Sequence, residues 1–401
     1  MADVAIVGGG PVGACAAALL ARGGLSVTLL EPQPPATSAP GTPLDARVVA
    51  VSRASERILR YCGAWDGLDA TRVEPYERMR IWHESAAARS EGVLVFDAAD
   101  VGEPNLGYIL ENRALQAALL AAFTAAGGQV LRAPLAALHI ADEGARLATA
   151  AGEVSARLVV GADGAQSAVR EAAGIPSTGA DYGQVAIVAN VATEHPHEHT
   201  AWQRFMREGT LAFLPLADGA SSIVWSADEA LAGTLLAAPP QEFARALERA
   251  ADAALGATRL LTERRSFPLR RLAAQRYVAA RLALVGDAAH VVHPLAGQGV
   301  NLGLLDAAAL AECVLAGVAA REDPGALSLL RPYERWRKSE VAVMAVAIDA
   351  FDRLLAHGTG PLARLAQSGL SFVNRRQELR RFFIERALGV KGELPRAARA
   401  T

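Results

Sequence analysis

The chain has 401 residues, a formal net charge of −2 and a hydrophobic fraction of 52%. A chain of this length buries a large core and usually forms two domains, because single cores stop growing near about 250–300 residues. The small net charge argues against a nucleic-acid-binding protein, which normally carries a surplus of basic residues. The three cysteines, Cys15, Cys62 and Cys313, match no metal-binding or disulfide spacing, so we expect a reduced, cytoplasmic protein.

The chain begins with the pattern of a dinucleotide-binding βαβ unit. A short apolar strand runs into the sequence GGGPVG at residues 8–13, and a helix of small residues follows. The next strand, residues 27–30, ends at Glu31, close to the ~20-residue distance at which an acid binds an adenosine ribose hydroxyl. Glycines let the backbone approach a pyrophosphate, which the helix N-terminus stabilises. The predicted dinucleotide site contains Gly8, Gly10, Gly13 and Glu31.

After a Pro-rich linker, residues 45–52 lead into a helix expected at residues 54–62. Arg47 could pair with the pyrophosphate or form a surface ion pair, and the residues alone favour neither. Residues 76–101 alternate loosely between apolar and polar, which predicts antiparallel strands outside the first domain. The pattern of the first domain resumes at residues 108–113, and a leucine-containing helix follows.

Two further strand ends point to an extended ligand. One apolar strand ends at Asp163-Gly164 and another, residues 282–285, ends at Gly286-Asp287. Ligands of open α/β sheets bind at the carboxyl ends of strands, where a carboxylate can accept a hydrogen bond from a sugar or ribityl hydroxyl. Together with the N-terminal motif, these two strand ends imply one extended ligand that contacts three loops. FAD meets this requirement better than NAD does. The alternative for Asp163-Gly164 is an ordinary turn.

Residues 286–304 form the centre of the predicted site. Pro294 breaks the chain, and Gly297 and Gly299 precede an apolar helical pattern whose N-terminus suits an anion. The helix also contains three polar or charged residues, which a membrane-spanning helix would bury at considerable cost. We therefore expect a core helix.

Between residues 181 and 269 the pattern predicts an antiparallel sheet, because short strands alternate with glycine-containing turns. One helical stretch is expected within this range, at residues 241–255. Its apolar and aromatic residues suit one wall of an organic-substrate pocket. Three histidines at residues 195–199 have no second cluster of ligands, so we expect no metal site there. The candidate substrate contacts are Phe213, Leu214, Pro215 and Trp225.

Two helices, expected at residues 333–355 and 362–388, close the chain. The part between Arg375 and Lys391 has more basic than acidic residues, interspersed with apolar ones. Such a helix can lie on anionic lipid or dock a partner protein, or it can be a solvated helix that caps its own domain.

Three motifs resemble those of the flavin-dependent aromatic monooxygenases of the para-hydroxybenzoate hydroxylase type. They are residues 8–13 with Glu31, the Asp163-Gly164 motif running to Arg170, and Gly286-Asp287. More narrowly, the chain resembles the ubiquinone-biosynthesis hydroxylases along nearly its whole length. The segments that carry this closer resemblance are residues 286–304, 108–116, 202–216, 224–225 and 333–349.

The resemblance implies an α/β fold with a Rossmann-like FAD-binding domain, an interleaved antiparallel-sheet substrate domain and C-terminal helices. The FAD-binding domain would comprise residues 1–75, 105–180 and 270–330, the substrate domain residues 76–104 and 181–269, and the helical region residues 331–401.

The resemblance also implies how FAD binds. Its adenosine would contact Glu31, its pyrophosphate would lie near residues 8–13 and Arg47, and its ribityl chain would contact Asp287. The flavin ring would lie over residues 294–299. In addition, Arg113 would touch the cofactor, and Asp163 would serve both FAD and the incoming nicotinamide. The chain has no second G-x-G-x-x-G, in agreement with a family in which NAD(P)H has no domain of its own.

The implied activity is hydroxylation of a polyprenylated phenol on the way to ubiquinone. In this family NAD(P)H reduces FAD, oxygen adds at flavin C4a, and the hydroperoxide transfers an OH group to the ring. The residues identify no general base. His290 and His293 flank the flavin motif, and we expect each to hydrogen-bond the loop.

Two alternatives stay open. One is another flavin oxidoreductase of the superfamily, such as a phenolic hydroxylase of a different pathway, a prenyl reductase or a halogenase. The W-x-W-x-I-P pattern of the flavin halogenases is absent from the chain. The other is a flavoprotein scaffold subunit of a quinone-biosynthesis complex. Whichever activity holds, the basic segment from Arg375 to Lys391 is the expected contact with the inner membrane face or with a quinone-biosynthesis complex.

Overall fold

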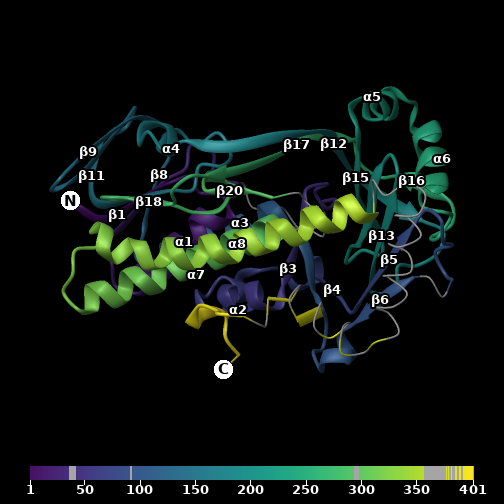
Figure 1. The fold of residues 1–401 in the computed structure, drawn as a ribbon, viewed down its shortest axis with the longest axis horizontal. Helices are drawn as coiled ribbons and strands as arrows, with labels where there is room; N and C mark the ends of the chain where they lie inside the picture. The colour runs from purple at the N-terminus through teal and green to yellow at the C-terminus, as the bar shows by residue number, and fades with distance from the viewer. Residues whose placement is uncertain are drawn as a thin grey trace.

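A computed structural model describes residues 1–35, 42–90, 93–292 and 298–355, with side chains of the last segment described for residues 299–346. Near the C-terminus it describes residues 376, 378, 381, 384–385, 388–389 and 392–400. The described residues form an eight-stranded, a nine-stranded and a three-stranded sheet with helices packed on them, which confirms the predicted α/β class. The two large sheets lie at opposite ends of the molecule (Figure 1).

The eight-stranded sheet is built on parallel strands. β1 (Ala2–Val7) pairs in parallel with β2 (Val27–Leu30) on one side and β11 (Gly152–Gly161) on the other, and β11 pairs in parallel with β19 (Leu282–Leu284). Each of these strands ends in a run of buried apolar residues, as expected where both faces of a parallel sheet are covered. The other strands are β8 (Gln129–Leu131), β9 (Leu135–Ala141), β10 (Gly144–Thr149) and β18 (Val278–Ala279).

Four helices pack in this part of the molecule: α1 (Pro11–Arg22), α3 (Asn112–Ala125), α7 (Gln298–Ala319) and α8 (Leu327–Leu355). α1 contacts both α3 and α7, while α8 lies along α7 (Figure 1). α7 is long and apolar enough to span a membrane, but it packs in the main core, where Ala307 and Leu310 are completely buried. This placement agrees with the predicted core helix.

The nine-stranded sheet is antiparallel except at one edge. Its strand order is β20-β17-β12-β15-β14-β13-β5-β6, and β13 pairs in parallel with β5. The predicted antiparallel sheet is therefore correct for the strands of residues 181–269. The earlier segment adds β5 and β6, which pair antiparallel with each other as predicted, while β5 pairs in parallel with β13. The bounds are β5 (Arg78–His83), β6 (Leu94–Asp97), β12 (Ser177–Thr193), β13 (Thr200–Met206), β14 (Gly209–Pro215), β15 (Ser221–Asp228), β16 (Thr258–Leu260), β17 (Arg265–Ala274) and β20 (His290–Val291).

β12 and β17 run side by side between the two ends of the molecule (Figure 1). Their antiparallel pairing shifts register between Asp181 and Gln184. A register shift of this kind bends the strand and increases its twist. The ladder, which belongs to the nine-stranded sheet, therefore bends along its length.

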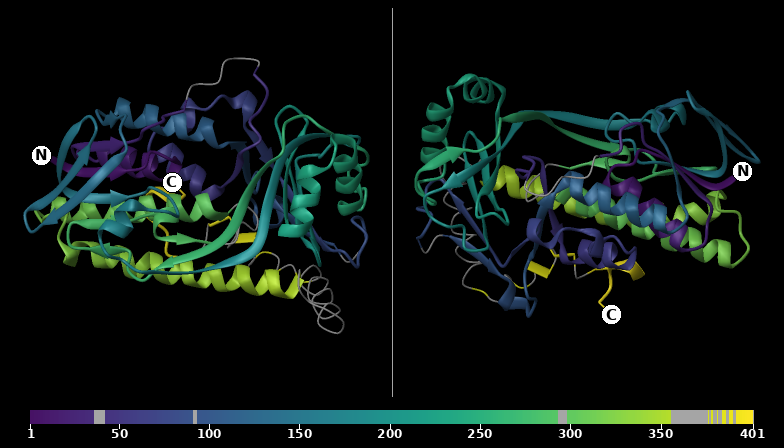
Figure 2. Two further views of the ribbon diagram at one scale, coloured as in Figure 1. Left: turned by 90° about the horizontal axis from the view of Figure 1, so that it is seen from above. Right: turned by 180° about the vertical axis from the view of Figure 1, so that it is seen from behind.

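Helices α5 (Glu229–Ala237) and α6 (Pro240–Ala250) cover the outer face of the nine-stranded sheet (Figure 2). The sequence predicted one helix at residues 241–255, so α5 was not predicted. The remaining elements are β3 (Val48–Ser52), β4 (Glu74–Tyr76) and β7 (Gly107–Glu111) of the small sheet, α2 (Arg53–Tyr61), α4 (Ala168–Ala172), and short 3₁₀ turns at Trp65–Gly67, Ala70–Arg72, Ala98–Val101, Gly286–Ala288 and Arg396–Ala398.

Most of the predicted helix at residues 362–388, and most of the basic segment from Arg375 to Lys391, lie outside the described residues. The domain boundaries given above stay a prediction.

A buried charge network ties α7 and α8 to the turn after β19. Asp306 of α7 is completely buried, and its carboxylate accepts hydrogen bonds from Arg337 Nε at 2.7 Å and from the backbone N–H of Gly286 at 3.1 Å. His290 Nε2 lies 2.5 Å from the same carboxylate. Burial raises the pKa of Asp306, but the interactions with His290 and Arg337 outweigh it and leave the pKa below its ordinary value. Asp306 is therefore an ionised group inside the core.

We expect Asp306→Asn to lower the free energy of unfolding by about 3–5 kcal/mol, because the substitution leaves Arg337 buried without its counter-charge. Urea unfolding of the FAD-loaded protein measures the effect. Asp66→Asn is the matched control, since Asp66 is 90% exposed and lies 3.9 Å from Arg60. Surface pairs of this kind contribute about 0–1 kcal/mol. A change as small as that of the control would contradict a structural role for Asp306.

The buried pair of Asp306 and Arg337 predicts that stability depends on pH. Because the pKa of Asp306 is lower in the folded state, its contribution to stability is present above its unfolded pKa and is lost as the pH falls through its folded pKa. The stability difference between wild type and Asp306→Asn should therefore be largest above about pH 4 and shrink below it. Thermal unfolding from about pH 6 to about pH 3 measures this difference. A difference that stays constant or grows on acidification would contradict the assignment.

Candidate functional site

The carboxyl ends of four parallel strands form one row at the edge of the eight-stranded sheet. The strands lie in the order β19-β11-β1-β2. The residues that follow them therefore lie along this edge in the spatial order Asp287, Asp163, residues 8–13 and Glu31. Neighbouring strands are about 4.8 Å apart, so the row spans about 14 Å. An extended dinucleotide can lie along a row of this length.

The glycine turn after β1 brings backbone close to backbone. Gly8 has a φ of +99°, and a Cβ atom there would lie 2.4 Å from the carbonyl oxygen of Ala162. A Cβ atom on Gly13 would lie 1.9 Å from the carbonyl oxygen of Gly8, so both positions require glycine. Gly10, by contrast, has nothing within 4 Å of its Cβ position. It precedes α1 without a capping side chain, which leaves the first N–H groups of α1 available for a pyrophosphate.

Glu31 is fixed beside this turn. Its carboxylate accepts hydrogen bonds from the backbone N–H groups of Gly9 and Gln33, both at 2.8 Å. On the other side, Gln116 of α3 donates from Nε2 to the carbonyl oxygen of Gly9 at 2.9 Å. Sequence reasoning did not identify Gln116 as a site residue; the available signal was an amide side chain within a largely apolar helix.

The loops after β11 and β19 are joined by Arg170. Its guanidinium donates to the carbonyl oxygen of Ala165 at 2.8 Å and to that of Ala288 at 2.9 Å. Asp163 accepts hydrogen bonds from Ser167 Oγ and from the backbone N–H of Val169, so its carboxylate organises the start of α4. The segment from Asp163 to Arg170 therefore holds the ends of β11 and β19 together. A direct role of Asp163 with FAD or nicotinamide stays a proposal.

A cavity of about 520 Å³ lies between the row of strand ends and the nine-stranded sheet. Ligand pockets typically have volumes of about 300–1,000 Å³. The residues that line it on the side of the strand ends include Gly10, Arg47, Asp287 and Gly299, four of the predicted cofactor contacts. On the opposite side it is lined by residues of β13, β14 and β15. One cavity thus connects the predicted cofactor site with the predicted substrate sheet.

Asp287 faces this cavity, where its side chain is accessible although protein surrounds it. Loss of solvation raises the pKa of Asp287, while His290 and Arg47 act in the opposite direction. Its carboxylate has no hydrogen bond to another described residue. It is therefore suited to accept a hydrogen bond from a ligand hydroxyl.

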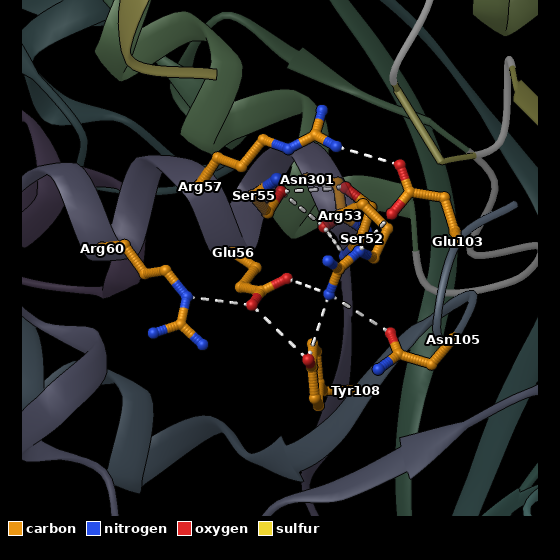
Figure 3. Close-up of polar contacts among 10 residues, drawn as sticks. All are labelled: Ser52, Arg53, Ser55, Glu56, Arg57, Arg60, Glu103, Asn105, Tyr108 and Asn301. Carbon is orange, nitrogen blue, oxygen red and sulfur yellow. Dashed lines mark hydrogen bonds and ion pairs between the residues drawn. The ribbon is translucent and has the colours of Figure 1, made fainter. Parts of the chain in front are cut away.

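A polar cluster holds β3, which also lines the cavity, against α7 (Figure 3). Asn301 donates from Nδ2 to the carbonyl oxygen of Ala50 at 2.9 Å, and its Oδ1 accepts from the N–H of Ser52 at 2.9 Å and from Ser55 Oγ at 2.7 Å. Asn301 thus fixes the first turn of α7 relative to β3. Sequence reasoning noted this residue only as a polar group in an apolar helix.

The cluster continues along α2 through Arg53 (Figure 3). Its guanidinium pairs with Glu56, donates to Tyr108 Oη at 3.0 Å, and pairs with Glu103 at 3.2 Å. Burial lowers the pKa of Arg53, but the charges of Glu56 and Glu103 and the phenol of Tyr108 outweigh it and leave the pKa raised. These contacts connect α2 with the small sheet, and so fix the backbone at one side of the cavity.

Two predicted cofactor contacts from this region have different positions. Arg47 lines the cavity, with its guanidinium carbon 5.8 Å from the ring centroid of Phe267. Arg113 does not line it; its side chain is 55% exposed and its guanidinium lies 3.7 Å from Asp45. A contact between Arg113 and the cofactor stays a prediction. The predicted contacts Pro294 and Gly297, together with His293, lie outside the described residues.

Only one of the four predicted substrate contacts faces the cavity. Leu214 lines it, whereas Phe213 and Trp225 pack on the other face of the sheet beneath α5 and α6. Pro215 is buried and, being two residues after Phe213 on the same strand, lies on the same face of the sheet as Phe213. Side chains alternate between faces, and because both faces are apolar the sequence did not show which one faces the ligand. Ala212 and Val224 line the cavity instead.

The loop histidines contact neighbouring protein groups. His199 Nδ1 lies 2.6 Å from Glu74, and His197 Nε2 lies 3.2 Å from the carbonyl oxygen of Leu216. Within the described part of the chain, no group of three or more His, Cys, Asp or Glu side chains is arranged to hold a metal ion.

Comparison with known proteins agrees with this geometry. Residues 1–346 match the family model described as FAD binding domain. The chain is 40% identical over 393 residues to the ubiquinone hydroxylase UbiL of Rhodospirillum rubrum, covering 97% of this chain and 90% of that protein. It is 37% identical over 391 residues to the 3-demethoxyubiquinol 3-hydroxylase of Escherichia coli, covering 97% and 98%.

Among solved structures, p-nitrophenol 4-monooxygenase PnpA from Pseudomonas putida DLL-E4 superposes with a TM-score of 0.78. The alignment covers 97% of this chain and 98% of that chain at 19% sequence identity. At this level of identity, the likeness establishes that the two proteins share a fold.

We expect Asp287→Ala to weaken FAD binding by roughly 10- to 100-fold, because hydrogen bonds to a charged group contribute about 1.5–3 kcal/mol. Flavin content after gel filtration and titration of the apoprotein with FAD measure the loss. Asp66→Ala is the control, since this carboxylate is 90% exposed and does not line the cavity. An unchanged FAD affinity in a folded Asp287→Ala protein would contradict the contact.

Proposed function

The chain belongs to the FAD binding domain family, and from its likeness to two hydroxylases of ubiquinone compounds we propose that it hydroxylates the ring of a polyprenylated phenol in ubiquinone biosynthesis. It is an FAD-dependent hydroxylase: residues 1–346 match the FAD binding domain family, and the two relatives that it matches over nearly its full length are hydroxylases. The cavity that connects the strand-end row with the nine-stranded sheet is the observation that carries the proposal, because it can hold a flavin and an organic substrate side by side.

The residues present fit FAD. The close-packed glycine turn and the uncapped start of α1 suit the pyrophosphate, Glu31 lies where the adenosine ribose would bind, and Asp287 offers a free carboxylate to the ribityl hydroxyls. When bound and reduced by NAD(P)H, FAD supplies the activated oxygen that enters the substrate ring.

The protein's own task is to provide a dry site with the correct charge. Residues of β13, β14 and β15 contribute apolar side chains to the cavity, including Ala212, Leu214 and Val224, and these exclude water from the reaction. The first turn of α7 lines the cavity at Gly299 and Val300. A helix N-terminus stabilises a nearby negative charge by about 0.3–1 kcal/mol when exposed and up to about 2 kcal/mol when partly buried. It would stabilise an anionic reduced flavin.

The cavity offers few groups for proton transfer. His290 is engaged with Asp306 in the core. Burial raises the pKa of Tyr76, which lines the cavity, to about 12, so its hydroxyl keeps its proton at neutral pH. Tyr76 can donate a hydrogen bond to a ring oxygen, but it is a poor base. The site would therefore suit an electron-rich phenol, whose ring needs no deprotonation by a side chain.

The purified, FAD-loaded protein should consume NAD(P)H in the presence of O2 and a short-chain prenylated phenol, and should add one oxygen atom to the ring. Mass spectrometry of the product and the ratio of product formed to NAD(P)H consumed measure this. Flavin reduction without any hydroxylated phenol, across phenols that differ in ring substitution, would contradict the proposal.

Complementation of quinone-deficient strains, each blocked at one ring position, distinguishes an enzyme from a scaffold. Wild type should restore quinone in the strain whose position it hydroxylates, and the accumulated intermediate identifies that position. Asp287→Ala should fail to do so if flavin chemistry is required. Full restoration by a folded Asp287→Ala protein that lacks flavin would instead favour a scaffold subunit.

A further inference from the structure

Three polar side chains share the cavity-facing side of the nine-stranded sheet. Gln203 of β13, Thr210 of β14 and Ser226 of β15 all line the cavity. Thr210 lies directly opposite Ser226, and Gln203 lies opposite Ala212, the next residue on the same face as Thr210. Directly opposed side chains are about 5 Å apart and diagonal neighbours about 7–8 Å apart. Thr210 is thus a direct neighbour of Ser226 and a diagonal neighbour of Gln203, and the three groups form one polar patch on the cavity-facing side of the sheet.

These side chains are buried, with exposures of 4% for Gln203, 5% for Thr210 and 5% for Ser226. Buried polar groups in folded proteins nearly always have hydrogen-bond partners. No side chain of the three hydrogen-bonds another residue in the described part of the chain. By comparison, Ser222 on the same face of β15 lies 3.5 Å from the carbonyl oxygen of Ala46. The patch therefore directs its hydrogen-bonding groups into the cavity.

The chemistry of the patch indicates which ligand it suits. An amide and two hydroxyls can both donate and accept hydrogen bonds, and none of them carries a charge. Such a patch satisfies neutral ring oxygens, such as hydroxyl or methoxy groups. A ring carboxylate would require a counter-charge that the patch does not contain. The side chains around it, Ala212, Leu214 and Val224, offer only apolar contact to the rest of the ring.

We propose that Gln203, Thr210 and Ser226 bind the oxygen substituents of the substrate ring and thereby select which ring carbon faces the flavin. This inference rests on the proposed function, since it assigns the part of the substrate that the nine-stranded sheet recognises. A site that hydrogen-bonds a substrate oxygen discriminates strongly against an analogue that lacks it, because its polar groups are then left unpaired.

The test uses the FAD-loaded protein, 2-methoxy-6-prenylphenol and 2-prenylphenol, with binding followed by the change in flavin absorbance. Gln203→Leu, Thr210→Val and Ser226→Ala should each weaken binding of the methoxy compound by roughly 2- to 10-fold, with a smaller effect on 2-prenylphenol. The same variants should form less product per NAD(P)H consumed, or hydroxylate a different carbon. Thr210→Ser, which restores a hydroxyl, should recover most of the loss.

Thr178→Val is the matched control, because it makes the same chemical change at an exposed position of β12 outside the cavity. Flavin content and melting temperature show whether each variant is folded, and the isosteric Thr210→Val carries the test if Gln203→Leu does not fold. The inference is overturned if all folded variants keep the same affinity, the same amount of product per NAD(P)H consumed and the same product position.

The results also separate this inference from the proposed function. A wild type that binds both phenols without hydroxylating them contradicts the proposed function alone, since the affinities of the variants for the two phenols still test the patch. A wild type that binds neither phenol overturns both.

Discussion

A carboxylate inside a protein core loses its hydration, so Asp306 is tolerable only because donors surround it. Those donors come from three places along the chain: Arg337 of α8, His290 of β20 and the backbone N–H of Gly286. Satisfying one charge therefore places two helices and the turn after β19 in a single arrangement. The adjacent residue of that turn is Asp287, which faces the cavity. The position of the cofactor-side carboxylate thus depends on a buried ion pair that touches no ligand.

The parts of the structure with strong local signals could be predicted from the sequence. The glycine turn, the run of parallel strands and their terminal acids follow from backbone sterics and from the continuous apolar composition of strands buried on both faces. The family resemblance identified FAD, and the match of residues 1–346 to the FAD binding domain confirms it. Local patterns were informative here because each strand, together with the glycines or the acid that follows it, is a short continuous segment of the sequence.

The substrate wall could not be predicted in the same way. Phe213 and Leu214 are adjacent and both apolar, yet one packs beneath the helices and the other lines the cavity. The choice depends on which face α5 and α6 cover, and α5 was not predicted. Gln203, Thr210 and Ser226 were overlooked for a related reason. These three residues lie on three different strands, and polar residues of these types give no special signal in the sequence. Only the register of the strands shows that they share one face.

The bent ladder of β12 and β17 affects how the size of the substrate space can change during evolution. The cavity has one wall from each large sheet, and the bent ladder of the nine-stranded sheet lies in the sequence between strands of the eight-stranded sheet. The separation of the walls therefore depends on the bend near Asp181 and Gln184 as well as on the packing within either core. Insertions or substitutions at that bend can resize the substrate space while both hydrophobic cores keep their residues. One scaffold can in this way accommodate rings of different size without a loss of stability in either half.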